Sequence, residues 1–110
     1  MFSFLDYTNE ILAVSKKNGV DIGVAYDMFR TDVRVGRALP YNTGGALPDF
    51  DFAAAREEWD ALTEDEQLNA YDEWHEFIAD CHSDVCVAFA ESEDTVAALV
   101  SEWRDSHENN

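Results

Sequence analysis

The strongest constraint on the fold is the spacing of large apolar side chains between residues 64 and 80. They recur at intervals of three and four, the period of a helix with one buried face. On a wheel of about 100° per residue they spread over one half of the helix: Leu68, Tyr71, Trp74, Phe77, Ile78 and Cys81. Just before them, Thr63 and Glu66 have the spacing of a capping box, with Thr63 as N-cap. The sequence therefore predicts a helix from Glu64 to about Asp80 that packs one half against a core.

The N-terminal part of the chain predicts two more helices. The segment from Ser3 to Lys17 has apolar residues three and four apart, and Asn18-Gly19 after it is a helix stop. Asp21 is suited to be the N-cap of a second helix. From Val33 onward the helical period is lost, and glycine, proline and asparagine become frequent. We therefore expect a loop there, with one short strand or hairpin near residues 33–43.

The remaining helices are predicted on either side of residues 64–80. One follows Asp51 as N-cap and extends from Phe52 to about Leu62, and a last one follows Ser92 or Asp94. Residues 84–90 fit both a strand and a helix. With 110 residues, the chain is expected to form one compact, mainly α domain of about five helices, with a near-neutral part (1–50) and an acidic part (51–110).

Negative charge is concentrated in the second half of the chain. Residues 1–50 hold six acids and five bases, and residues 51–110 hold 18 acids and two bases, which gives net charges of −1 and −16. Repulsion between like charges disfavours folding. The concentration of acids in one half of the chain therefore indicates that these acids have a function. Two alternatives stay open: a solvated acidic surface without a specific role, and adaptation to high salt. Salt adaptation predicts acids over the whole chain, which the first half does not show.

The predicted binding surface is the acidic side of the 64–80 helix. Five carboxylates share an arc of roughly 100° opposite the apolar half: Asp65, Asp72, Glu73, Glu76 and Asp80. Asp72, Glu76 and Asp80 follow one another in steps of four, and no Lys or Arg is placed on this helix to offset them. Glu57 and Glu58 add charge from the preceding helix. We predict that these seven residues contact a partner.

This pattern indicates a non-catalytic inhibitor that imitates a nucleic-acid backbone. The expected partner is a basic nucleic-acid-binding protein, such as a nuclease or a DNA- or RNA-binding factor, because carboxylates can replace phosphates on Arg and Lys. In composition the chain is similar to the DNA-mimic proteins that phages use against restriction or CRISPR nucleases. The alternative is an acidic adaptor that binds its partner through an apolar groove, with the charge serving solubility.

Other partners and locations follow from the same composition. Direct contact with nucleic acid is not expected, because a domain with a net charge of −17 repels phosphates. A membrane span is not expected either, since the longest apolar run, residues 85–90, has six residues. We expect a cytoplasmic protein with reduced thiols. The oligomeric state stays open, with a dimer among the alternatives.

Patterns for catalysis or cofactors do not appear in the sequence. The soft metal ligands cluster at His75, Cys81, His82 and Cys86, but their spacing fits no zinc pattern. We find no nucleophile elbow, phosphate-binding glycine loop or dinucleotide fingerprint. The sequence therefore predicts no enzyme activity, no metal site and no cofactor.

Overall fold

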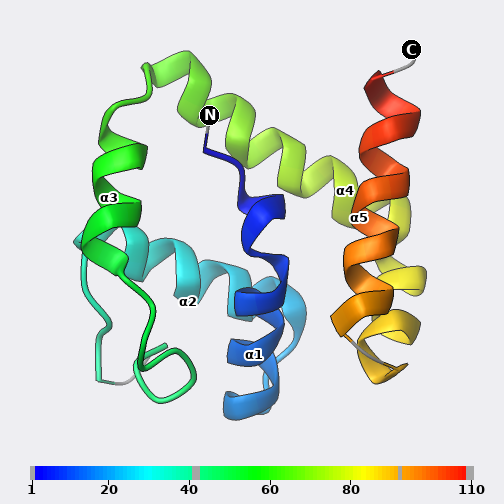
Figure 1. Ribbon diagram of the computed structural model, residues 1–110, viewed down its shortest axis with the longest axis horizontal. Coiled ribbons are helices and arrows are strands. Elements are labelled where there is room, and N and C mark those ends of the chain that lie inside the picture. Colours follow the sequence, from blue (N-terminus) through cyan, green and yellow to red (C-terminus); the bar gives the residue numbers. More distant parts are fainter. Residues whose placement is uncertain (1, 41–42, 92, 109–110) are drawn as a thin grey trace.

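The computed structural model describes residues 2–40, 43–91 and 93–108, and within these ranges the protein is helical (Figure 1). A short 3-10 helix, η1 (Phe4–Tyr7), leads into α1 (Thr8–Asn18). The other elements are α2 (Ile22–Val35), α3 (Phe52–Asp60), α4 (Glu64–Glu91) and α5 (Glu93–Glu108). The described residues form five α-helices and no strand, which confirms the mainly α prediction.

The helices form two sets joined by the N-terminal segment. In the first set α1 packs on α2 and α2 packs on α3, while in the second α5 packs on α4. Figure 1 shows η1 and α1 running through the middle of the molecule, with α3 on one side and α5 on the other. Because η1 contacts α4 and α1 contacts α5, this segment ties the two sets together.

The helix starts agree with the predicted N-caps. The carboxylate of Asp21 accepts the Val24 backbone N–H at 3.0 Å, and the carboxylate of Asp51 accepts the Ala54 N–H at 3.0 Å. The α1 helix ends where Gly19 adopts a left-handed φ of 65°. The last helix starts at Glu93, so Asp94 lies inside α5 instead of capping it, and Ser92 lies outside the described residues.

The capping box of α4 is present in both directions. The Thr63 hydroxyl accepts the Glu66 backbone N–H at 3.2 Å, and the Glu66 carboxylate accepts the Thr63 N–H at 2.9 Å. We expect Thr63→Ala to lower the free energy of unfolding by about 0.5–2 kcal/mol, since one donor of the first turn loses its partner. Urea titration of the variant measures this effect. An unchanged midpoint would contradict the cap.

The strand or hairpin predicted near residues 33–43 is wrong for the described part of that range. Helix α2 continues to Val35 and ends at Gly36, whose φ is 80°, and residues 37–40 and 43 form no strand. Residues 41 and 42 lie outside the described residues. Val33 is completely buried, and this tertiary burial outweighs the alternating pattern that favoured a strand.

The loop after α2 is held by a buried carboxylate. Asp32, on the last turns of α2, is completely buried, as is Thr43. One Asp32 oxygen accepts the backbone N–H groups of Leu39 (3.3 Å) and Thr43 (3.2 Å), and the Thr43 hydroxyl also donates to it. The chain therefore folds back onto the end of the helix that it has just left.

The ambiguous segment 84–90 is helical. It continues α4 beyond a kink at Cys81, whose φ and ψ of −125° and 16° are not helical. After the kink Val85 and Ala88 are buried, a spacing that suits a helix.

One residue of the predicted apolar half of α4 is not part of the core. Leu68 is 53% exposed, whereas Trp74 and Phe77 are buried. At roughly 100° per residue Leu68 lies about 120° around the helix from Trp74, at the margin of the apolar half. The predicted apolar half is therefore correct at Trp74 and Phe77 and wrong at Leu68.

The core is rich in aromatic rings. Tyr26 stacks on Trp74 with 4.9 Å between ring centroids and 11° between planes, and Phe4 packs edge-on against Tyr26 at 5.1 Å. The Arg30 guanidinium lies 5.6 Å from the Tyr26 ring and 5.4 Å from the Tyr71 ring. These contacts join η1, α2 and α4, so the buried side of α4 is fixed and its opposite side is presented to solvent.

Candidate acidic partner-binding surface

The seven predicted contact residues lie on α3 and α4, and the structure gives them different environments. Asp65, Asp72 and Glu76 are exposed, and none has an ion pair or hydrogen bond to another side chain in the described part of the chain. They follow one line along α4, and we call them the acidic ridge. From Asp65 to Glu76 the helix rises about 16 Å. The ridge is therefore a straight row of accessible charges on a rigid helix.

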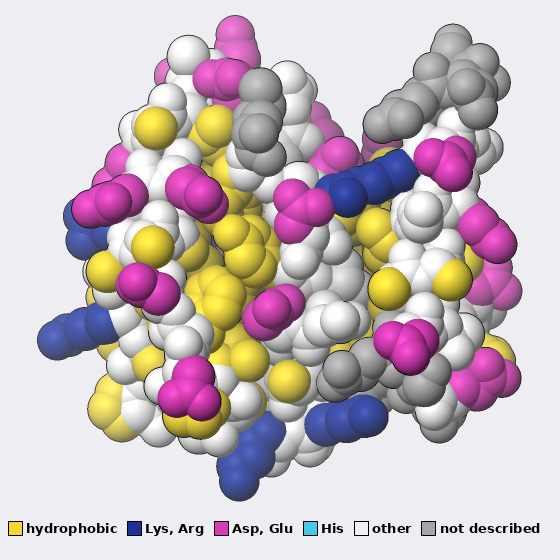
Figure 2. Space-filling model, viewed as in Figure 1, with side chains coloured by type: hydrophobic (Ala, Val, Ile, Leu, Met, Phe, Trp, Pro, Cys, Tyr) yellow, Lys and Arg dark blue, Asp and Glu magenta, His cyan; other side chains and the backbone are white. Residues whose placement is uncertain are grey.

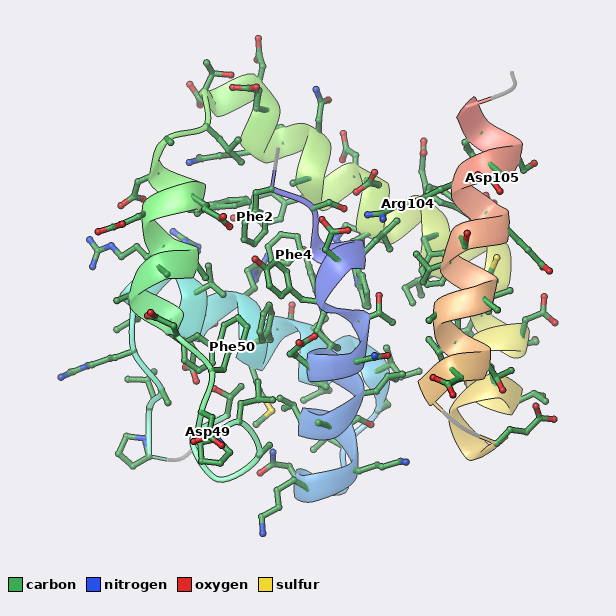
Figure 3. All side chains as sticks on the ribbon, in the orientation of Figure 1. Phe2, Phe4, Asp49, Phe50, Arg104 and Asp105 are labelled. Carbon is green, nitrogen blue, oxygen red and sulfur yellow. The ribbon has the colours of Figure 1, made fainter. Side chains whose placement is uncertain are left out.

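Glu73, which lies beside the ridge, forms a contact within the protein. Its carboxylate accepts the Ser3 hydroxyl, and the same Ser3 oxygen accepts N–H groups from Leu5 (3.2 Å) and from Arg104 (2.9 Å). Arg104 also pairs with Asp6 at 2.9 Å. Figure 3 shows Arg104 reaching from α5 toward η1. This network, the N-terminal latch (Ser3, Asp6, Glu73 and Arg104), joins η1, α4 and α5.

Asp80 also has partners within the protein. Its carboxylate accepts the indole N–H of Trp103 at 3.0 Å and lies 3.6 Å from Nε2 of His107. The His107 ring packs on the Trp103 ring at 3.9 Å between centroids. Asp80 therefore fastens the end of α5 to α4, although its side chain remains exposed to solvent.

The ridge borders a groove between α4 and the end of α5. Asp72, Glu73 and Glu76 line one wall, and Trp103, Arg104 and His107 line the other, around a volume of about 450 Å³. In Figure 2 a Lys/Arg side chain spans the gap between the central mass and the right-hand column, where Figure 3 labels Arg104. One base from another helix thus lies near these acids, which the sequence of α4 alone did not indicate.

Glu57 and Glu58 lie on α3 and form none of the latch contacts. Both are exposed, and the Glu58 carboxylate accepts the Tyr7 hydroxyl at 3.3 Å. Tyr7 ends η1, and Ser3, just before η1, bonds to Glu73. Glu58 and Glu73 therefore contact the N-terminal segment from two different helices, and of the two only Glu73 lines the groove beside the ridge.

The phenol of Tyr7 makes stability depend on alkaline pH. Burial, and secondly the charge of Glu58, raises the pKa of Tyr7 to about 12, whereas the unfolded value is about 10. The folded state holds this proton more tightly, so the phenol stabilises it below about pH 10, and this contribution is lost as pH rises toward 12. Urea titrations at about pH 9 and about pH 11 should show a smaller loss for Tyr7→Phe than for the wild type. Equal losses would contradict this origin.

The cysteines do not form a reactive or metal-binding cluster in the described residues. No group of three or more His, Cys, Asp or Glu side chains there has a metal-binding arrangement. Burial, followed by the charges of Asp84 and Asp80, raises the pKa of the half-buried Cys81 thiol. Cys86 is a free, exposed thiol. None of the described helices combines the length and the apolar character needed to cross a membrane.

The chain has no detectable relatives in the three comparisons. No protein-family model matches it, and no curated protein or solved structure is significantly similar.

The latch residues outside α4 are the part of this site that the sequence did not predict. Ser3 and Glu73 are 70 positions apart, and Ser3 and Arg104 are 101 apart. No local pattern signals such pairs. The sequence shows only that residues 51–110 hold many more acids than bases. Each of the two arginines there therefore has many possible acidic partners, and the sequence does not indicate which one it contacts.

Proposed function

We propose that the protein is a non-catalytic decoy that occupies the basic nucleic-acid-binding surface of a partner protein. The observation that carries the proposal is the acidic ridge: Asp65, Asp72 and Glu76 are exposed and unpaired on one line of a helix whose opposite side is buried. Arg and Lys side chains that bind phosphates can bind such carboxylates instead, Arg often through two parallel hydrogen bonds. Because the helix is fixed by its core contacts, little ordering is needed on binding.

The structure separates the residues that can be mutated for this test from those that hold the fold. Glu73 and Asp80 have partners within the protein, so their replacement would mix binding with stability. The ridge variant is therefore Asp65→Asn, Asp72→Asn and Glu76→Gln. It removes three charges at nearly constant size. Relief of the repulsion between Asp72 and Glu76 gains about 0.2–0.5 kcal/mol, whereas the loss of the Asp65 charge from the first turn of α4 costs about 0.3–1 kcal/mol, so we expect the free energy of unfolding to change by less than about 1 kcal/mol.

A matched variant removes the same number of charges elsewhere. Glu10→Gln, Asp49→Asn and Asp105→Asn change carboxylates on α1, on the loop before α3 and on α5. None of the three forms an ion pair or a side-chain hydrogen bond in the described residues. The two triple variants have equal net charge, so any difference between them reports position.

The test is competition for a basic partner. A nucleic-acid-binding partner is first captured by this protein at low ionic strength and released by a salt step. The released partner is then loaded with labelled DNA or RNA. Wild type and the control variant should displace the label, and the ridge variant should do so only at higher concentration, because it associates more slowly. If the wild type displaces no nucleic acid from any partner that it binds, the decoy function is wrong. If both triple variants compete like the wild type, the ridge is not the contact surface.

Salt dependence separates the decoy from the adaptor alternative. Phosphate-like contacts weaken steeply as ionic strength rises, because exposed charges are screened within about 10 Å at 0.1 M salt. Binding through an apolar groove changes little over the same range. The dissociation constant measured across a salt series should therefore rise for the wild type and rise less steeply for the ridge variant.

A further inference from the structure

A second surface lies on the outer side of α5, along the part of α4 that follows the kink. Here the two helices enclose a groove of about 400 Å³. Its apolar floor is formed by Val87 on α4 and by Ala98 and Leu99 on α5. The groove beside the acidic ridge uses other residues of α5, namely Trp103, Arg104 and His107. The two surfaces are therefore distinct.

One residue of this floor, Val87, is the most exposed large apolar side chain in the described residues. Val87 is 62% exposed, compared with 53% for Leu68, 44% for Val24 and 37% for Val35. Leu99 is half-buried beside it. The neighbouring Val85, Val96 and Val100 are buried in the core, which does not include Val87. Val87 adds nothing to that packing, and covering it would remove apolar area from water.

Carboxylates surround this apolar floor on both sides. Asp84 and Glu91 stand on the α4 side and Glu102 on the α5 side, all exposed, and none has a basic partner in the described residues. In Figure 2 the right-hand column, which is α5 with the end of α4 behind it, shows Asp and Glu side chains next to exposed hydrophobic atoms. The groove therefore combines an apolar centre with a negative rim.

We propose that this groove docks an amphipathic helix of a partner protein, with Lys or Arg residues flanking its apolar stripe. A helix that presents apolar residues at positions i, i+3 or i+4 and i+7 covers a groove of this kind, and basic neighbours match its rim. Charge also excludes the simplest alternative occupant. A second copy of this chain would bring Asp84, Glu91 and Glu102 of both molecules together, which is unfavourable. This inference is independent of the ridge and of the proposed decoy function.

The test uses a synthetic peptide of Leu and Lys arranged with helical periodicity, and a scrambled peptide of the same composition. Binding is measured by fluorescence anisotropy at one fixed ionic strength. The wild type should bind the periodic peptide at least about tenfold more tightly than the scrambled one, because only the periodic peptide can place Leu on the floor and Lys at the rim together. Val87→Ser should weaken binding roughly five- to tenfold, and Glu91→Gln with Glu102→Gln should weaken it as well.

Two matched variants identify the surface. Val24→Ser removes another exposed valine, on α2, and the ridge variant removes carboxylates from the other groove; both should bind the periodic peptide like the wild type. All of the substituted residues are exposed in the wild type. Thermal melting is used to check that each variant is folded. Equal binding of the two peptides, or wild-type binding by Val87→Ser, would overturn the proposal. Neither result depends on whether the protein displaces nucleic acid, so the decoy function can fail while this inference stands.

Discussion

Replacement of Trp74 by alanine should lower the free energy of unfolding by about 3–5 kcal/mol, as expected for the loss of a large buried aromatic side chain. Trp74 is 2% exposed and stacks on Tyr26 at 4.9 Å between ring centroids. Phe77, one turn further along α4, lies 6.2 Å away. The alanine leaves a cavity between α2 and α4 that these rings cannot close without losing their other contacts. Urea unfolding followed by far-UV circular dichroism measures the change.

Leu68→Ala on the same helix is the matched control. Leu68 is 53% exposed, so its truncation should change the unfolding free energy by no more than about 0.5 kcal/mol. The sequence alone placed Leu68 and Trp74 together in the apolar half, so the pair tests the position of the buried face. Comparable losses for both variants, or a loss below about 1 kcal/mol for Trp74→Ala, would show that α4 is rotated from the orientation described.

The second large effect is expected at Asp32. Asp32→Ala removes the acceptor of the Leu39 and Thr43 backbone N–H groups and of the Thr43 hydroxyl. A buried donor left without a partner costs about 1–3 kcal/mol, so the combined loss should be about 3–5 kcal/mol. Thr43→Val, which removes only the hydroxyl, should cost about 1–3 kcal/mol. Urea titration of the two variants measures both losses.

A carboxylate on the same helix provides the comparison for Asp32. Asp27 is exposed and pairs with Arg30 at 3.5 Å, and truncation of such a surface pair should cost no more than about 1 kcal/mol. Limited proteolysis adds a readout that global unfolding does not give, because the loop from residue 37 to residue 50 should become sensitive in Asp32→Ala alone. If Asp32→Ala and Asp27→Ala are equally stable, Asp32 does not hold the loop.

Those features of the fold that depend on neighbours in sequence were predictable. The caps at Asp21, Asp51 and Thr63 bond to backbone groups three residues away, so the local pattern contains all the information needed. The strand near Val33 was predicted wrongly because alternating valines favour a strand in isolation, whereas the burial of Val33 depends on the rest of the fold. The kink at Cys81 had no local signal such as a proline.

The candidate site was predictable to a smaller extent. Helical periodicity placed Asp65, Asp72 and Glu76 on one exposed line, because that relation needs only the period of the helix. It could not show that Glu73 bonds to Ser3 or that Asp80 bonds to Trp103, since these partners come from other helices.

The N-terminal latch has a consequence for the order of folding during synthesis. Ser3 is synthesised before its partners Glu73 and Arg104, which follow 70 and 101 residues later. The helix pairs α1–α2 and α2–α3 are close in sequence and can form early, whereas closing so long a loop is slow. The segment around Ser3 should therefore be among the last parts to become fixed, and a chain that ends within α5 before Arg104 should lack the Arg104 contacts to Ser3 and Asp6 while keeping the Ser3–Glu73 bond.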